Sequence, residues 1–204
     1  MSRRDFLFLP LLLMLGHAAL LTPSAVVASP QVLIVCGSGG QNEYTAQFLD
    51  WGSRLQHVLP SLMGIEPEAI FLLTEKSNPS SSLVSIEQAF KTIQPRLQPG
   101  EPFYLFLIGH GSSLRGESKL QIPGPDLQAS WLKEKIDDLT KNPLVLIHSG
   151  SASAGFINHL SAPQRILCTA TKSVDENNAT DFMAHFLEGL ETGLADTDYD
   201  GRIS

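Results

Sequence analysis

The sequence predicts an α/β domain of three layers, with a mostly parallel central sheet between two layers of helices. Short, continuous apolar runs such as "PFYLFLIG" (102–109) are typical of strands that are buried on both faces. Segments with apolar residues at helical spacing separate these runs. No repeat, linker or low-complexity block divides the 204 residues, so we expect one domain behind a leader.

The predicted elements alternate between strand and helix. The first strand is "QVLIVCG" (31–37), a β-branched apolar run that ends in glycine. Further strands are predicted at 69–74, 102–109, 143–148 and 164–171, with a short hairpin at 119–124. Helices are predicted at 42–62, 82–94, 126–139, from about residue 154, and at 179–191.

Side chains with useful chemistry directly follow three of the predicted strands. They are Cys36, His110 and the elbow serines Ser149, Ser151 and Ser153. In open parallel sheets, ligands and catalytic groups gather beyond the carboxyl ends of the strands. The sequence therefore predicts a functional site at this edge, where the small-residue elbow "SGSASAG" (149–155) resembles the turn that holds a nucleophile in several hydrolase folds.

The first 28 residues have the pattern of a secretory signal peptide. Arg3 and Arg4 precede an apolar run from Phe6 to Leu15, and small residues up to Ala28 suit a cleavage site. "SRRDFL" also satisfies the twin-arginine export pattern, but the run is more apolar than that route prefers. The run is also short for a bilayer span. We therefore expect a secreted or periplasmic domain (29–204) with a leader of bacterial style and no membrane contact beyond export.

The charge of the chain argues against a nucleic-acid partner. The formal net charge is -7, and removal of Arg3, Arg4 and Asp5 with the leader makes it -8. An acidic domain without a Lys/Arg cluster repels polyanions. Two cysteines, Cys36 and Cys168, are too few for a disulfide scaffold, and no motif predicts a cofactor.

Two segments combine into a more specific pattern. "FYLFLIGHGS" (103–112) is a strand followed by His-Gly, and residues 144–182 contain the serine elbow and a later strand that ends in "TAT". Together they resemble the legumain-like branch of the caspase-fold cysteine peptidases, over roughly residues 31–204. In that family the elbow reads Cys-x-Ser-Gly and holds the nucleophile. The resemblance implies a caspase-like sandwich in which His110 is catalytic and the Gly111 amide donates to an oxyanion.

The sequence departs from this family at the nucleophile. When Cys-x-Ser-Gly is laid onto "SASA", Ser151 takes the nucleophile position, Ser153 the following serine, and Ser149 the place where the family usually has an acid. A thiol is partly ionised near neutral pH, whereas a serine hydroxyl needs a well-placed base. A caspase-type site holds its histidine and nucleophile apart, so this exchange should nearly abolish turnover. The resemblance, with this departure, therefore implies a catalytically impaired peptidase homologue that either acts by binding a peptide or protein or is a degenerate paralogue.

Two alternatives keep an enzyme. An amide or ester hydrolase would use His110 with Ser151, or with Cys36 if the caspase-like strand order places the two strands side by side. Buried strand cysteines are usually inert, however. An α/β-hydrolase would use Ser153, one of two acids (Asp175 or Asp181), and His185. The glycine spacing around its serine is wrong, and the histidine fits the flank of an amphipathic helix.

Two further residues are expected to be structural. Adjacent side chains on a strand point to opposite faces, so His148 should not share a face with Ser149 and is interpreted as a polar strand-end residue. In the caspase-like strand order Cys168 lies far from Cys36, and no disulfide is expected.

The acidic segment "DTDYDG" (196–201) contains part of a calcium loop. Asp196, Asp198 and Asp200 take positions one, three and five, and Gly201 takes position six. The bidentate acid of position twelve would lie beyond Ser204. The sequence favours a solvated acidic turn, leaves calcium binding open and predicts no other metal site. Because the segment would naturally lead into another helix, we also expect a shortened chain.

Overall fold

Five parallel strands form the centre of the fold. The computed structural model describes residues 30–139 and 142–198, and its large sheet has the strand order β2-β1-β3-β7-β8. Each neighbouring pair in this sheet is parallel. The strands are β1 (Gln31–Cys36), β2 (Ile70–Leu73), β3 (Phe103–Ile108), β7 (Leu144–His148) and β8 (Arg165–Thr169).

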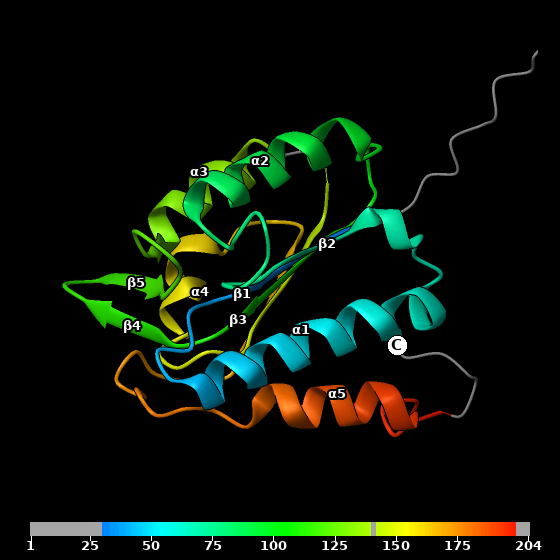
Figure 1. The fold of residues 1–204 in the computed structure, drawn as a ribbon. Coiled ribbons are helices and arrows are strands. Elements are labelled where there is room, and N and C mark those ends of the chain that lie inside the picture. Colours follow the sequence, from blue (N-terminus) through cyan, green and yellow to red (C-terminus); the bar gives the residue numbers. More distant parts are fainter. Residues whose placement is uncertain (1–29, 140–141, 199–204) are drawn as a thin grey trace, which may run out of the picture.

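Helices cover both faces of this sheet, which confirms the three-layer α/β prediction (Figure 1). On one face lie α1 (Asn42–Met63) and α5 (Phe182–Thr192); on the other lie α2 (Leu83–Ile93), α3 (Ala129–Asp137) and α4 (Gly155–Leu160). Two single 3₁₀ turns, Pro67–Ala69 and Gln94–Arg96, precede β2 and follow α2. The leader expected at 1–28 lies outside the described residues.

The helices form where the apolar stripes predict them. In α2 the buried residues Ile86, Ala89, Phe90 and Ile93 recur at helical spacing, and Ser82 caps the helix by accepting a hydrogen bond from the Ser85 amide. Successive residues of the strands divide between the two cores, because side chains on a strand alternate between faces. Leu33 and Val35 thus face α2, while Ile34 and Cys36 face α1.

A small antiparallel sheet projects beyond the carboxyl end of β3. It contains β4 (Gly111–Leu114), β5 (Glu117–Leu120) and β6 (Leu127–Gln128). The hairpin predicted at 119–124 is longer than expected: Lys119 and Leu120 pair with Gln128 and Leu127 of β6, so the segment forms the end of its first strand and part of its loop. A further hairpin joins β4 to β5, with its turn at Arg115 and Gly116, both at positive φ. The apolar residues Leu120 and Ile122 are buried in the core.

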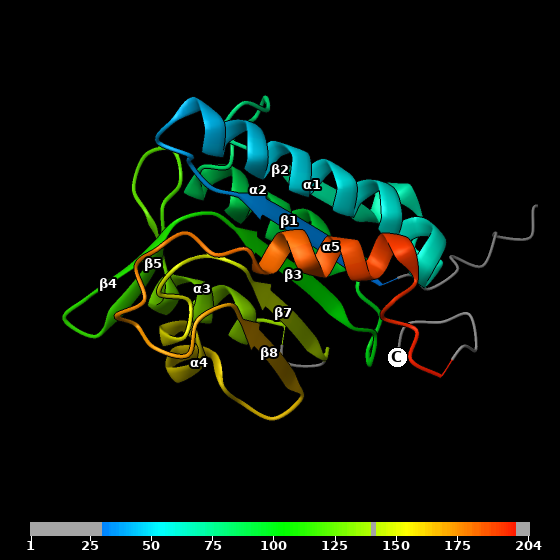
Figure 2. The same ribbon diagram turned by 90° about the horizontal axis from the view of Figure 1, so that it is seen from below.

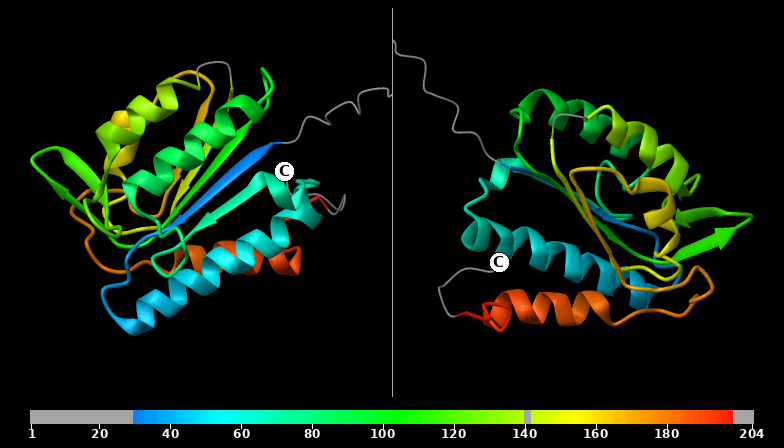
Figure 3. Two further views of the ribbon diagram at one scale, coloured as in Figure 1. Left: turned by 45° about the horizontal axis from the view of Figure 1, so that its top comes forward. Right: turned by 180° about the vertical axis from the view of Figure 1, so that it is seen from behind.

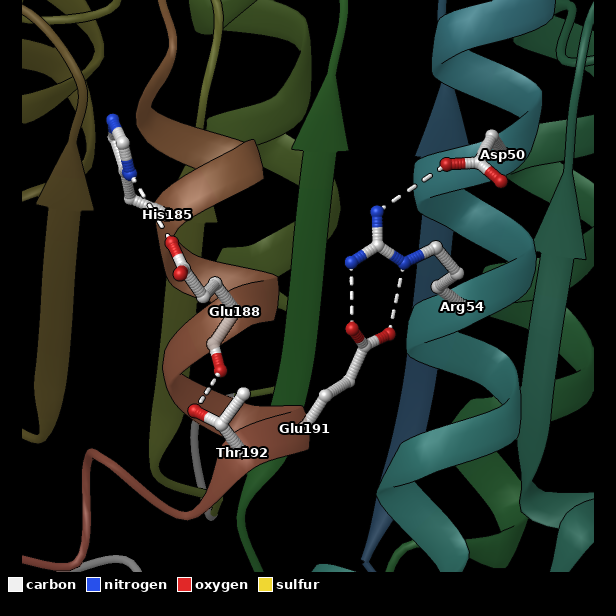
Figure 4. Close-up of polar contacts among 6 residues, drawn as sticks. All are labelled: Asp50, Arg54, His185, Glu188, Glu191 and Thr192. Carbon is white, nitrogen blue, oxygen red and sulfur yellow. Dashed lines mark hydrogen bonds and ion pairs between the residues drawn. The ribbon is translucent and has the colours of Figure 1, made fainter.

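Helix α5 is fastened to α1 by an ion pair (Figure 4). The guanidinium of Arg54 donates two hydrogen bonds to Glu191, at 2.8 and 2.6 Å, and a third to Asp50 at 3.4 Å. Beneath this pair Met183 and Leu187 are fully buried against the sheet. The two helices therefore form one layer, held by apolar packing inside and by a bidentate ion pair outside.

This layer does not extend to the last strand. In Figure 2, α1 and α5 cross β1 and β3, whereas β8 lies beside them. Ile166 of β8 is 66% exposed, and Cys168, two residues later, is exposed on the same face. No helix in the described ranges is long and apolar enough to span a membrane.

Candidate functional site

The carboxyl ends of the parallel strands meet at one edge of the sheet, as predicted. The β4–β5 hairpin and the segment between β8 and α5 lie at this edge, which is on the left in Figure 1 and is seen from two further directions in Figure 3. The first strand pairs with the His-bearing strand, with Cys36 opposite Ile108, which confirms that expectation. His110, Gly111 and the elbow are therefore near neighbours, and their side chains decide what the edge can do.

Ser151 is locked onto the backbone of Gly111. Its hydroxyl accepts a hydrogen bond from the Gly111 amide at 3.0 Å and donates one to the Gly111 carbonyl at 3.1 Å. The residue is only 2% exposed. Gly111 permits this contact because it has no side chain: a Cβ here would overlap with the Ser151 carbonyl oxygen. The structure thus brings these two predicted residues together as a buried clamp.

Two backbone amides of this edge that could stabilise an oxyanion are occupied by the protein. The Gly111 amide points to Ser151 Oγ, and the Ala152 amide donates to the Glu176 carbonyl at 2.8 Å. An oxyanion hole needs free donors aimed at the developing charge. Ala152 has φ 49°, in the left-handed region that a residue with a Cβ seldom adopts. The elbow is therefore a sharp turn, and the Gly111 and Ala152 amides are already paired.

The other two elbow serines are buried and hydrogen-bonded as well. Ser149 Oγ donates to the Leu107 carbonyl at 3.3 Å, and its own carbonyl accepts from Thr180 Oγ1. Ser153 Oγ lies 3.2 Å from Thr171 Oγ1 and accepts from the Thr171 amide. Neither hydroxyl is exposed to solvent. The serines thus hold the elbow to β3 and to the segment that follows β8.

His110 lies on the opposite, more accessible side of this edge. Its half-buried ring makes edge-to-face contacts with Tyr44 and Phe48 of α1, at centroid distances of 4.6 and 5.0 Å. Burial lowers the pKa of the imidazole, and a hydrogen bond with the Gly39 backbone partly opposes that shift. Within the described part of the chain, no hydrogen bond joins the imidazole to Ser151 or to Cys36.

Glu75 fastens the loop that carries Gly39. Its carboxylate accepts hydrogen bonds from the Gly39 amide and from Thr45 Oγ1, each at 2.9 Å. Burial acts to raise the pKa of Glu75, but the bonds from Thr45 and Gly39 and the charge of Lys76 outweigh it, so the pKa is lowered. The carboxylate therefore stays ionised and holds the β1–α1 loop next to the imidazole.

Cys36 is not placed as a nucleophile. The thiol is 1% exposed and faces α1, in contact with Gly52. Burial raises its pKa to about 12, against a weaker opposing effect of the Gly52 backbone. Cys168 is exposed three strands away, so the two thiols are free and distant, as expected. The thiolate that an attack requires is absent at neutral pH.

His148 is more deeply buried than a strand-end residue needs to be. Its ring packs edge-on against Phe156 at 4.6 Å, on the α4 side of the sheet, and Nδ1 accepts from the Gly150 amide at 3.1 Å. This placement on the face away from α1 agrees with strand alternation. Burial lowers the pKa of His148 to about 3, with the Leu107 backbone opposing. The imidazole is thus a neutral structural acceptor beneath the elbow.

The serine triad of an α/β-hydrolase is not assembled. His185 lies on the exposed side of α5, where Nδ1 is 3.6 Å from Glu188 (Figure 4). Ser153 is fully buried against Thr171. The interpretation of His185 as a helix flank is confirmed.

Sequence reasoning missed the residues that link the elbow to other segments. Thr171, Glu176 and Thr180 reach it from the segment after β8, and Glu75 orders the loop beside the imidazole. Glu75 could have been predicted as a site residue, because it follows β2, whose carboxyl end lies at the same edge of the sheet. Thr171 ends the predicted strand 164–171, but that pattern does not show that its hydroxyl meets Ser153. Glu176 and Thr180 belong to a polar loop with no periodicity, and nothing in their order predicts their partners.

The calcium prediction remains a prediction. Asp196 and Asp198 lie in the turn after α5, but Asp200, Gly201 and the end of the chain fall outside the described residues. Among residues 30–139 and 142–198, no group of three or more His, Cys, Asp and Glu side chains is placed to hold a metal ion.

No protein-family model matches the chain, and no curated protein matches it.

Proposed function

We propose that this chain is a catalytically silent homologue of the legumain-like caspase-fold peptidases, and that it binds a peptide or protein without cleaving it. The observation that carries the proposal is the Ser151 hydroxyl, which is buried and hydrogen-bonded to both backbone groups of Gly111. A nucleophile must be reachable and must pass its proton to a base. Ser151 meets neither condition, and Cys36 is buried and protonated.

The occupied amides support the same conclusion. An acyl-transfer enzyme gains much of its rate from donors that wait for the oxyanion, and removal of one such donor costs about 10²–10³ in kcat. Here the Gly111 and Ala152 amides are bound to Ser151 and Glu176. A change from serine to cysteine at residue 151 alone would leave the Ala152 amide engaged.

A fluorophosphonate probe, which labels activated serines, tests the proposal together with the stability of Ser151→Ala. We expect no labelling of the mature protein. We expect Ser151→Ala to lower the free energy of unfolding by about 1–3 kcal/mol, because both Gly111 groups lose a buried partner. The matched control is Ser112→Ala: Ser112 is half-buried in β4, its hydroxyl has no hydrogen-bond partner in the described ranges, and the change should cost less than about 0.5 kcal/mol.

A serine hydrolase would give a different result in both measurements. Stoichiometric labelling that disappears in Ser151→Ala and in His110→Ala, with little change in stability for Ser151→Ala, would make the chain a serine hydrolase. The proposal would then be wrong.

A further inference from the structure

A groove opens next to the elbow, between α4 and the segment that leaves β8. Its volume is about 680 Å³. It is lined by Ala154, Ile157 and Asn158 on the helix side and by Thr169, Ala170, Thr171, Lys172, Ser173 and Val174 on the other. The groove lies beyond the carboxyl ends of β7 and β8, where parallel sheets collect ligands. It has the size of a site for several amino-acid residues.

Most polar side chains of the groove are already engaged. Thr169 Oγ1 donates to the Thr171 carbonyl, Thr171 Oγ1 accepts from the Ala154 amide, and Ser173 Oγ donates to Asp175. Two side chains are left. The Asn158 amide makes no hydrogen bond and the Lys172 ammonium makes no ion pair with any residue that the structure describes.

The side chains without a partner indicate which kind of ligand the groove can bind. Lys172 is the single charged residue among those that line the groove, although the chain as a whole has a net charge of -7. The apolar side chain of Ile157, 37% exposed, forms the wall next to Asn158. An ammonium recognises an anion, an amide recognises a peptide bond, and an exposed isoleucine accepts an apolar side chain.

We propose that this groove binds a peptide segment through a carboxylate held by Lys172, with the peptide backbone on Asn158 and an apolar side chain on Ile157. This inference rests on the proposed function, since it names the ligand of the silent homologue. It also gives the elbow a use. Ser153 and Ala154 hold Thr171 in place, so the turn that would carry a nucleophile shapes the floor of the groove.

The carboxylate has two sources, a chain terminus or an acidic side chain, and three peptides separate them. The probes are acetyl-Ala-Ala-Val with a free carboxylate, the same peptide as the carboxamide, and acetyl-Ala-Asp-Val carboxamide. Each is titrated to about 10 mM into the ¹⁵N-labelled mature protein, and the amide shifts of 169–174 are followed by NMR. We expect shifts with at least one of the two carboxylate peptides, and none with the plain carboxamide.

Variants of Lys172 make the test specific. Lys172→Gln should weaken carboxylate binding about fivefold to tenfold, and Lys172→Arg should retain it. The control Lys91→Gln removes an exposed lysine of α2 and should change nothing. Equal binding of carboxylate and carboxamide, unchanged affinity in Lys172→Gln, or no shift with any probe overturns the inference. These outcomes concern this groove as the peptide site, whereas the catalytic silence of the chain is tested separately by labelling at Ser151.

Discussion

The two halves of the candidate site differ in how far their polar groups are buried and hydrogen-bonded within the protein. On the elbow side every serine hydroxyl is buried and hydrogen-bonded, and the backbone amides of Gly111 and Ala152 are occupied. On the imidazole side His110 is half-buried between aromatic rings and is steadied by a loop that Glu75 holds. The elbow is thus part of the packed interior, while the imidazole remains at the surface.

This difference shows that the side chains of the elbow serve packing and hydrogen bonding within the protein. A hydroxyl is small and can both donate and accept, so a serine in a tight turn can clamp two backbone groups at once. A thiol is larger and a weak hydrogen-bonding partner. A serine at residue 151 therefore suits a structural clamp better than a cysteine would, and the difference between the two halves can be tested by substitution.

The largest effect is expected for Gly111→Ala. The added Cβ would overlap with the Ser151 carbonyl oxygen and would crowd the Lys119 carbonyl, so backbone must move. Overpacking of this kind costs about 3 kcal/mol or more. The control is Gly189→Ala in α5, where the Cβ finds ordinary contact with Ala195 and should stabilise by about 0.5–1 kcal/mol. Urea unfolding measures both; equal stability of the two variants would mean that the elbow is loosely packed.

His148→Asn should alter the pH dependence of stability. The folded-state pKa of about 3 lies below the ordinary 6.5, so between these values the unfolded chain binds a proton that the folded chain excludes. Stability therefore falls as the pH falls, by up to about 1.4 kcal/mol per pH unit. The variant should lose this slope between pH 6.5 and 3 but keep an acceptor for the Gly150 amide. His185→Asn, on the exposed side of α5, is the control and should leave the slope of stability against pH unchanged. An unchanged slope in His148→Asn would mean that the imidazole beneath the elbow is not buried.

Glu75→Gln should have the smallest effect and should act on the imidazole side. The pKa of Glu75 is lowered from 4.5, so its contribution to stability is complete above pH 4.5 and is lost as the pH falls through the lower folded value. The variant should be less stable at pH 7 by about 1 kcal/mol and less sensitive to acid below pH 4.5. The His110 ring signals in NMR should shift because the Gly39 loop relaxes. Unmoved ring signals would show that Glu75 does not position the imidazole.

Much of the fold was predictable because it depends on local patterns. The apolar runs gave the five long strands, and helical stripes such as that of 82–94 gave the helices to within a few residues. The face of His148 followed from strand alternation. The adjacency of the Cys36 and His110 strands was expected from the strand order that the family resemblance implies, because local patterns do not record which strands pair.

The candidate site was predictable in its location only. The strand-end rule placed the elbow and His110 at one edge, but the bonds that close the elbow join residues about 20 to 40 positions apart, such as Ser151 with Gly111 and Ser153 with Thr171. The Gly111 amide was expected to face a substrate and instead faces a side chain of the protein. The direction of one amide depends on tertiary packing, which no short motif encodes.

The ion pair between Arg54 and Glu191 can form only late in the synthesis of the chain. The two residues are 137 positions apart, so a nascent chain that has already formed α1 must wait for α5 before the ion pair can close. Until then the chain on the ribosome exposes the part of the sheet that α5 covers, where Phe106 of β3 packs against Phe186. A chaperone that binds exposed apolar segments would have the longest time to bind the chain at this stage, and the docking of α5 would release it.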